Sequence, residues 1–318
     1  MHVNDLESTP NAVTERQPLD LQATSIMTVL CLIWGLQQIV LKVAAPDITP
    51  LMQIALRSGF SAALVWILML IRKEPLDLLG ENLRPGLLVG ALFAIEFFLI
   101  GEGLRFTSAS HMVVLLYTAP IFVALGLHWK FPAERMNVLQ WLGIVMAFAG
   151  IAITFLLREQ QNGGSNMLFG DLLALLAGAA WGATTVAVRI TSLANAPATQ
   201  TLLYQLLGGF IGLMVAADLL GQTSIKFSAL AIGSMIFHSV IVSFASYLAW
   251  FWLLKKYLAS RLGVFSFLTP LFGVLFGVWL LDEPLEPSFV VGSILVLAGV
   301  VLVSGHAWLA QTFARKAV

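Results

Sequence analysis

Charged residues and cysteine are scarce in this sequence. Only 11% of its 318 residues are Asp, Glu, Lys or Arg, whereas a soluble globular domain contains about 25%, so a soluble fold of this length is excluded. The acidic and basic residues balance at a formal net charge of zero, which gives no reason to expect a nucleic-acid partner. The single cysteine, Cys31, cannot form an internal disulfide and is expected to be a small buried apolar side chain.

Motifs of metal sites, hydrolases and ATP-driven pumps are also lacking. There is no HExxH, no CxxC and no Cys/His cluster, so we predict neither a metal nor a cofactor. There is no GxSxG turn and no GxxxxGK[ST] phosphate loop, which disfavours a serine hydrolase and an ATP-driven pump. We therefore expect a protein that is not an enzyme. The alternative, an intramembrane enzyme, would need a catalytic cluster that the sequence does not show.

Apolar residues, by contrast, make up 59% of the chain and give a mean hydropathy of +0.90. A membrane-spanning helix needs about 20 mostly apolar residues. Ten segments meet this requirement, namely residues 25–43, 51–71, 86–105, 111–130, 138–157, 168–190, 199–219, 229–253, 261–281 and 288–306. The connections are short and rich in turn residues, so we predict an all-α membrane protein with ten transmembrane helices in the lipid bilayer.

The two halves of the chain repeat the same landmarks in the same order. The pairs are Trp34-Gly35 and Trp181-Gly182, Ala109-Ser110 and Ala259-Ser260, Pro120 and Pro270, Glu134 and Glu283, Gly143 and Gly292, and Gly150 and Gly299. Each half holds five predicted helices, and because five is odd the second half must cross the membrane in the opposite sense. We therefore predict two inverted five-helix repeats, residues 25–157 and 168–306. Secondary transporters are commonly built in this way.

The distribution of basic residues predicts the orientation of the chain. With the N-terminus inside the cell, the cytoplasmic side receives twelve of the 17 Lys and Arg residues and the outer side receives four. Because cytoplasmic loops are enriched in basic residues, both termini are expected in the cytoplasm, as a flexible tail at 1–24 and a second tail at 307–318. Glycine pairs four residues apart, such as Gly86 and Gly90, predict close helix packing within a monomer or a weak dimer.

Several landmarks resemble those of the drug/metabolite transporter superfamily. Residues 170–175, Gly-Asp-Leu-Leu-Ala-Leu, followed by Trp181 resemble the start of the second repeat in its ten-helix EamA branch. The repeated Ala-Ser, Pro, Glu and Gly positions resemble the ends of both repeats. The resemblance, which covers residues 25–306, implies a carrier in the cytoplasmic (inner) membrane of a prokaryote. It also implies export of amino acids, related metabolites or drugs, through a cavity lined by the middle helices.

The first helix departs from a pattern known in the superfamily. Four-helix relatives carry an essential glutamate there, whereas this helix contains Trp34, Gln37 and Gln38 and no acidic residue. A proton-coupling role therefore does not transfer from those relatives to this helix. The energy for transport must come from a gradient of substrate or ions, so protons stay a candidate coupling ion.

Pro120 and Pro270 are expected in the middles of the fourth and ninth helices. Proline removes one backbone donor and bends a helix, and the freed carbonyl must be buried in protein or face a watery cavity. Because the two prolines are equivalent in the repeats, we predict that they shape the cavity or act as hinges. The alternative is a packing kink without a role in transport.

Arg57 and Glu96 are charged residues expected within the bilayer, where a charge costs at least about 2.5–3.5 kcal/mol. A rise of about 1.5 Å per residue places Arg57 about 9 Å and Glu96 about 13 Å below the outer surface, with Glu102 shallower. Arg57 could therefore pair with either glutamate. A substrate site, with Arg57 on a carboxylate and Glu96 on an ammonium or a proton, and a structural ion pair between the second and third helices stay open.

Trp34 and Trp181 are repeat-related aromatic residues with neutral polar groups within one turn. Gln37 and Gln38 follow Trp34, and Thr184 and Thr185 follow Trp181 at the same offset. An aromatic wall with neutral polar groups suits recognition of small polar solutes, although helix packing is the alternative for each tryptophan alone. Further candidate cavity residues are Tyr117, Tyr204, Gln205 and Tyr247.

Three histidines lie in or near the predicted helices. His238, in the eighth helix, could relay protons between pH 5 and 8, or be a neutral histidine bonded across helices. His111 and His128 lie near helix ends and are expected at the membrane interfaces.

Together these features predict a secondary transporter that exports small metabolites, above all amino acids, by alternating access around a central cavity. The alternative cargo is a cationic drug or a nucleobase-like compound. A substrate without a carboxylate should be indifferent to Arg57, whereas an amino acid should not.

Overall fold

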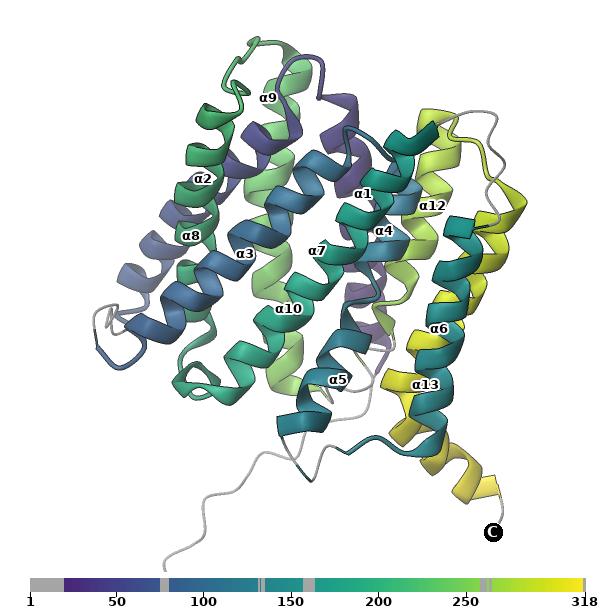
Figure 1. Ribbon diagram of the computed structural model, residues 1–318. Coiled ribbons are helices and arrows are strands. Elements are labelled where there is room, and N and C mark those ends of the chain that lie inside the picture. The colour runs from purple at the N-terminus through teal and green to yellow at the C-terminus, as the bar shows by residue number, and fades with distance from the viewer. Residues whose placement is uncertain are drawn as a thin grey trace, which may run out of the picture.

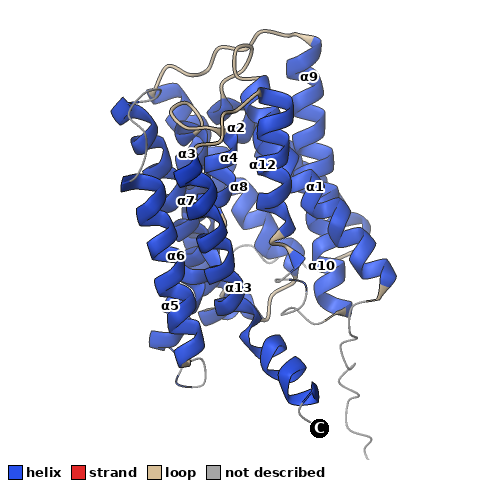
Figure 2. Ribbon diagram, turned by 90° about the vertical axis from the view of Figure 1, so that its right-hand side faces the viewer, coloured by secondary structure: helices blue, strands red, loops and turns tan. Residues whose placement is uncertain are grey.

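The computed structural model describes residues 20–74, 80–130, 132, 135–156, 164–257, 262 and 265–316 (Figures 1 and 2). Its α-helices are α1 (Leu21–Val43), α2 (Pro50–Ile71), α3 (Leu83–Gly103), α4 (Ala109–Leu116), α5 (Ala119–Lys130), α6 (Val138–Leu156), α7 (Gly164–Ile190), α8 (Ala198–Leu219), α9 (Ala229–Ile236), α10 (Tyr247–Lys256), α12 (Leu268–Leu281) and α13 (Pro287–Lys316). A short 3-10 turn, η2 (Ser192–Ala194), follows α7, and a π-helix, η3 (Phe237–Ser246), joins α9 to α10. The described residues contain no β-strand, which confirms the predicted all-α fold.

The helices match the ten predicted crossings in order. Within the described ranges, seven apolar stretches are long enough to cross a membrane and three apolar helices are shorter. α1 begins at Leu21, inside the predicted tail, because the Asp20 side chain accepts a hydrogen bond from the backbone N–H of Ala23 (2.7 Å) and so caps the helix. α13 continues to Lys316, so residues 307–316 of the predicted second tail are helical.

Some of the predicted features lie outside the described residues. They are residues 1–19 of the N-terminal tail, the connection at 157–163, and the landmarks Glu134, Ala259 and Ser260.

The fourth and ninth predicted helices are interrupted rather than bent. The fourth divides into α4 and α5 at residues 117–118, and Pro120 is the second residue of α5. Residues 266–267 form the turn before α12, whose third residue is Pro270. The first N–H groups of a helix have no partner within it, so proline fits at the start of a helix and not in its middle. The expected mid-helix bends are therefore corrected to two breaks, at equivalent positions of the repeats.

Helix contacts recur with the two repeats exchanged. α1 packs on α12, and their counterparts in the other repeat, α7 and α5, also pack on each other. Likewise α3 packs on α8, and their counterparts, the eighth crossing through its η3 part and α2, pack on each other. Equivalent helices also pair with each other, α2 with α8 and α6 with α13, and Figure 1 shows the last pair along one side of the bundle. Contacts that recur when the two repeats are exchanged indicate an approximate twofold axis between the halves.

The glycines of α6 and α13 show the same relation at the level of atoms. A Cβ atom at Gly143 would lie 2.7 Å from the carbonyl oxygen of Gly299, and one at Gly150 would lie 2.5 Å from that of Gly292. In the sequence, however, Gly143 is equivalent to Gly292 and Gly150 to Gly299. A crossed pairing of this kind is what a twofold axis between the two helices produces, and the inverted repeats are confirmed.

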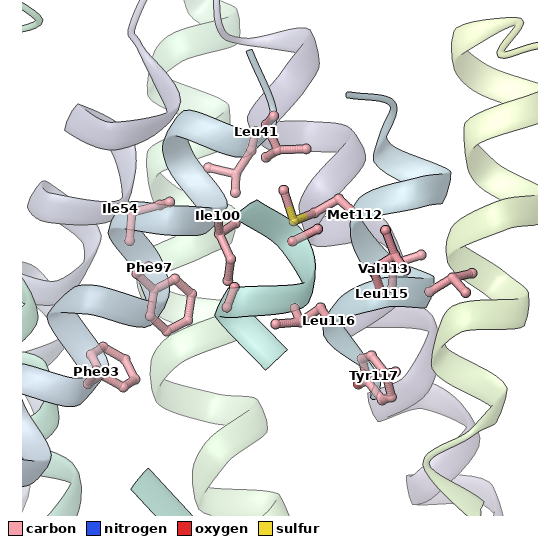
Figure 3. Close-up of a cluster of buried hydrophobic side chains, with 14 of the residues drawn as sticks. Leu41, Ile54, Phe93, Phe97, Ile100, Met112, Val113, Leu115, Leu116 and Tyr117 are labelled. Atoms are coloured by element: carbon pink, nitrogen blue, oxygen red, sulfur yellow. The ribbon is translucent and has the colours of Figure 1, made fainter. Parts of the chain in front are cut away.

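Buried apolar side chains join the helices at the centre of the bundle (Figure 3). Leu41 of α1, Ile54 of α2, Ile100 of α3 and Met112 of α4 are fully or almost fully buried in this cluster. Elsewhere many large apolar side chains point outward, among them Trp279, which is 72% exposed. Lipid tails are as apolar as such side chains, so helices in a bilayer associate through close packing rather than by removing apolar surface from water.

Candidate functional site

A cavity of about 500 Å³ lies between the two repeats. Its walls come from α1, α3 and α4 of the first repeat and from α7, α8 and α10 of the second. This volume lies within the range of about 300–1,000 Å³ that is usual for small-molecule sites. The predicted site residues in its walls are Trp34, Gln37, Glu96, Tyr117, Trp181, Thr184, Thr185, Gln205 and Tyr247.

A second hollow, of about 570 Å³, lies between α2 and α8 and has a different character. Its lining, which includes Phe60, Trp66 and Phe210, consists of apolar residues alone. An apolar groove in a membrane protein suits lipid tails, whereas a polar solute needs placed polar groups. The candidate functional site is therefore the cavity between the repeats.

The two repeat-related tryptophans form part of an aromatic wall. The indole N–H of Trp34 donates to the Ser246 hydroxyl (2.9 Å), and its ring meets the ring of Trp250 edge to face, with centroids 5.7 Å apart. Trp181 meets Tyr117 in the same way at 5.4 Å. Both indoles thus lie in the cavity wall and contact aromatic side chains beside them.

The glycine after each tryptophan explains why the dipeptide is repeated. A Cβ atom at Gly35 would lie 3.0 Å from Phe272 Cβ and 3.1 Å from the Thr269 carbonyl oxygen. One at Gly182 would lie 2.6 Å from Phe122 Cβ and 3.1 Å from the Ala119 carbonyl oxygen. Each glycine therefore lets the first helix of one repeat approach the other repeat just after its break, beside the cavity.

Arg57 and Glu96 do not form the ion pair that the sequence left open. The Arg57 guanidinium is 1% exposed, donates from Nη1 to Gln37 Oε1 (3.2 Å), and lies over the Phe97 ring at 4.5 Å. Its Nη2 is buried without a hydrogen-bond partner. Glu102 is engaged elsewhere, since it accepts from Arg105 (2.7 Å) and from Gln222 (2.7 Å). Arg57 therefore lies directly behind Gln37 and Phe97, two residues of the cavity wall.

Besides Arg57, three predicted site residues lie away from the cavity lining. Gln38 is buried, and its Oε1 has no hydrogen-bond partner. Tyr204 packs its ring against Gly86, in the contact between α8 and α3. His238 contacts the Ser234 carbonyl oxygen through Nδ1 (2.8 Å) and the Gln37 carbonyl oxygen through Nε2 (3.1 Å). Its Nδ1 also lies 3.1 Å from the Ser234 hydroxyl, and a neutral imidazole, which carries one N–H, can donate to one of the two carbonyl oxygens.

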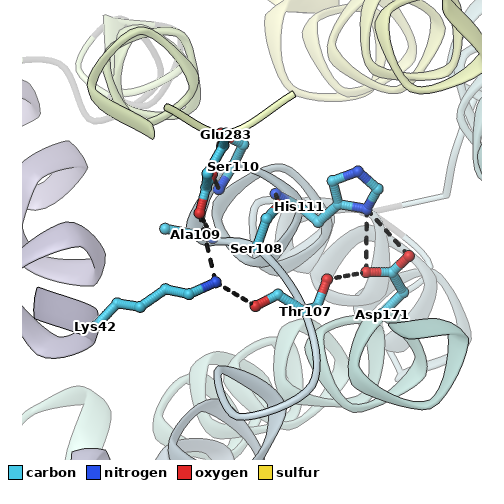
Figure 4. Close-up of polar contacts among 8 residues, drawn as sticks. All are labelled: Lys42, Thr107, Ser108, Ala109, Ser110, His111, Asp171 and Glu283. Carbon is cyan, nitrogen blue, oxygen red and sulfur yellow. Dashed lines mark hydrogen bonds and ion pairs between the residues drawn. The ribbon is translucent and has the colours of Figure 1, made fainter. Parts of the chain in front are cut away.

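The sequence did not predict a buried polar network at the end of the bundle where α4 begins (Figure 4). The Glu283 carboxylate accepts from the backbone N–H groups of Ala109 (2.7 Å) and Ser110 (3.0 Å) and from the Ser110 hydroxyl (2.7 Å). Lys42 Nζ lies 3.5 Å from Glu283 Oε1 and donates to the Thr107 carbonyl oxygen (2.7 Å). A carboxylate at a helix N-terminus meets unpaired N–H groups and the positive end of the helix dipole. Glu283 thus ties the second repeat to the start of α4.

A histidine and an aspartate make the second part of this network. His111 Nδ1 lies 3.1 Å from both carboxylate oxygens of Asp171, and the Thr107 hydroxyl donates to the same carboxylate. His111 is 3% exposed, so it is buried among the helices at this end of the bundle. Its ring stacks on Phe289 of α13, with centroids 3.9 Å apart and an angle of 9°. The pair joins α4 of the first repeat to α7 of the second.

The sequence held partial signals for this network. Glu283, Ala109 and Ser110 are landmarks of the repeats, and Asp171 belongs to the stretch that resembles the EamA branch. No spacing connects them, because the contacts join residues 60 to 241 positions apart. Across the described ranges, no group of three His, Cys, Asp or Glu side chains could hold a metal ion.

Ten apolar crossings, two inverted repeats and a cavity between them with polar groups in its wall define a multi-pass membrane transporter of the inverted-repeat class. A family model agrees: the EamA-like transporter family matches residues 23–156 and again residues 168–305. The chain therefore belongs to the EamA-like transporter family.

Relatives of known sequence or structure agree with this assignment. An uncharacterized transporter of Bacillus subtilis, YoaV, is 26% identical over 85% of this chain and 92% of its own length. A probable amino-acid metabolite efflux pump of Escherichia coli is 29% identical over 90% of this chain and 94% of its own length. A solved crystal structure with 19% identity covers 89% of this chain and 97% of its own, with a TM-score of 0.63. At that identity it supports the fold alone.

Proposed function

We propose that this protein exports amino acids, or metabolites with the same ammonium and carboxylate groups, across the cytoplasmic membrane of a prokaryote. One observation carries the proposal. Glu96 stands in the cavity wall, and the buried Arg57 lies behind Gln37 and Phe97 of the same wall with an unpartnered amino group. The two similar proteins named as probable amino-acid metabolite efflux pumps, from Escherichia coli and Salmonella typhimurium, support it.

The chemistry of these groups matches the two ends of an amino acid. The Glu96 carboxylate can accept the substrate ammonium group from inside the cavity. Gln37 Oε1 occupies one donor of the Arg57 guanidinium, which is the position that a substrate carboxylate oxygen would take if Gln37 turned aside. The second oxygen would then reach the unpartnered Nη2, giving the paired contact that arginine makes with carboxylates. Gln37 would act as a placeholder for the substrate.

The two helix breaks support alternating access as the mechanism. Leu116, Tyr117 and Ser266 line the cavity at these breaks, where residues outside regular helix can take up a change of backbone angle. The two repeats would rock around the cavity, with both termini in the cytoplasm as the basic residues indicate. A substrate or ion gradient would drive the cycle.

A cationic or nucleobase-like substrate is the second candidate. The aromatic residues Trp34, Trp181 and Trp250 line the same cavity as Glu96, and aromatic faces attract organic cations. Such a substrate would use Glu96 and the rings but not Arg57.

A survey of metabolites in the medium tests the proposal directly. Cells that overproduce the protein should release more of one or a few amino acids than cells in which the gene is deleted. Arg57→Gln and Glu96→Gln should each lower this release about tenfold to hundredfold, because a hydrogen bond to a charged group contributes about 1.5–3 kcal/mol.

Arg105→Gln and Glu102→Gln are matched controls, because this second Arg and Glu pair lies at the end of α3, outside the cavity lining. They should leave release within about twofold. Loss with Glu96→Gln alone would favour a cation. Full release by both cavity variants, at normal levels in the membrane, would rule out the proposed site.

A further inference from the structure

Among the described residues, His111 and Asp171 form the one histidine–carboxylate ion-pair contact, and both side chains are buried. The other candidates for handling protons are already occupied. His238 is bonded to backbone oxygens, and Glu96 faces the substrate cavity. The imidazole of His111 lies within reach of both oxygens of one carboxylate, an arrangement that suits either a neutral ring donating a proton or an imidazolium ion.

The position of this pair connects its protonation to the contact between the repeats. His111 is the third residue of α4, and Ser110 beside it donates to Glu283 of the second repeat. At the other end of α4, Leu116 and the adjacent Tyr117 line the cavity. α4 is a helix of eight residues, so whatever holds its start also sets the position of this part of the cavity wall.

Groups from four helices and one connecting segment make up the network that contains His111. α7 contributes Asp171, the segment after α12 contributes Glu283, and α1 contributes Lys42, while α13 presents the uncharged ring of Phe289. The charged group in contact with His111 is Asp171, whereas Glu283 is paired with Lys42 and with the start of α4. Histidine is the side chain whose charge changes between about pH 5 and 8.

We propose that His111 and Asp171 form a proton-binding site, and that a bound proton holds this end of the cavity closed. Protonation turns a hydrogen bond to a carboxylate into a charge-assisted ion pair, which is stronger and ties α4 to α7 more firmly. The end concerned is the one predicted to face outward, so acid outside the cell stabilises the closed outer end. The proton site itself does not depend on the proposed function. Its role in the transport cycle rests on the proposed export function.

Labelling of a cavity cysteine tests this site without knowledge of the substrate. In a Cys31→Ser background, Ile100→Cys places a thiol in the cavity wall near the end of α3. A membrane-impermeant maleimide is added to whole cells at pH 5.5 and 8.0. Each rate is divided by that of Phe227→Cys, whose side chain is 86% exposed in the segment before α9, so that the effect of pH on the thiol itself cancels.

The wild-type background should label severalfold faster at pH 8.0 than at pH 5.5. With His111→Gln this ratio should fall to one, and Asp171→Asn should give fast labelling at both pH values. His128→Gln, which removes a histidine from α5, should keep the wild-type ratio.

Two results would overturn the proton site: a wild-type rate that does not change with pH, including no labelling at either pH, or an unchanged ratio in His111→Gln. Because Asp171 is fully buried and its variant could fail to fold, the His111→Gln result decides. A normal pH response without amino-acid export would leave the proton site standing and would count against the proposed function instead.

Discussion

Two buried polar side chains of α2 differ in how well their hydrogen bonds are satisfied. Gln53 is fully buried, donates to the carbonyl oxygens of Leu41 and Ile48, and accepts from Ser234. Arg57, one turn further along, has a buried amino group with no partner. A side chain kept for stability resembles the first, and a side chain kept for a ligand resembles the second.

This contrast predicts opposite effects of the same kind of substitution. Gln53→Met should destabilise the protein by about 1–3 kcal/mol, because it leaves buried carbonyl groups unpaired. Arg57→Met should be neutral or stabilising, by up to about 4 kcal/mol, because it removes a buried charge that is incompletely paired. Thermal unfolding of the two purified variants in detergent measures the difference. A large loss of stability with Arg57→Met would mean that Arg57 holds the fold together.

At the scale of elements, the short helix α4 carries the features that a moving part requires. It begins at the Glu283 and Asp171 contacts and ends at the break at residues 117–118 beside the cavity. α4 also packs on α12 and α7, both from the other repeat. Its position therefore depends on contacts between the repeats, which are the contacts that alternating access must break and remake.

A single methyl group should loosen these contacts without changing any charge. A Cβ atom at Gly277 would overlap the Ser110 hydroxyl and lie 2.5 Å from Glu283 Oε2. Gly277→Ala should therefore push the carboxylate from the start of α4 and raise maleimide labelling at Ile100→Cys severalfold. Gly233→Ala is the control, because no atom lies within 4 Å of its added Cβ. Equal labelling rates in both variants would show that the Glu283 contacts do not keep the cavity closed.

The sequence was most informative about elements and least informative about how their ends meet. Long apolar runs are required of any membrane helix, so the ten crossings and the repeats could be predicted. The positions of the irregularities at Pro120 and Pro270 could be predicted, but not that they are breaks rather than bends. Proline either bends a helix or begins one, depending on which backbone hydrogen bonds its neighbours make.

The polar network could not be predicted for a different reason. Lys42, His111 and Glu283 each lie at a helix end, where a charged or polar residue is ordinary and needs no partner. Only the packing of α1, α4, α7 and α13 brings these ends together and buries them. The cavity shows the same limit, since Trp34 and Trp181 were found through their duplication, whereas Tyr204 has no such signal and lies elsewhere.

At the scale of the whole molecule, the inverted repeats fix which connections share a side of the membrane. The connection before α2 meets the segment before α9, through Thr49, which donates to the Gln222 carbonyl oxygen (3.0 Å), and through the pairing of Ile48 with Ile225. At the opposite end Ser192 donates to Asn82 (2.6 Å). Each end of the bundle is thus built from both repeats.

Surface labelling should report these two ends separately. In intact cells, an impermeant maleimide should react with Phe227→Cys, at the end predicted to face outward. Glu81→Cys, near Asn82 at the other end, should react only after the membrane is made permeable. Both residues lie in exposed connections. Reaction of both cysteines in intact cells would contradict the opposed arrangement, and the reverse pattern would invert the predicted orientation.

Counterflow in proteoliposomes tests most directly whether the cavity between the repeats carries an amino acid, as we propose. Vesicles containing the purified protein are loaded with the twenty unlabelled amino acids and diluted into trace labelled ones. We expect transient uptake of at least one labelled amino acid, a loss of uptake of about tenfold or more with Arg57→Gln, and normal uptake with Arg105→Gln. No uptake of any amino acid by the wild-type protein, or equal uptake by Arg57→Gln, would contradict the proposal.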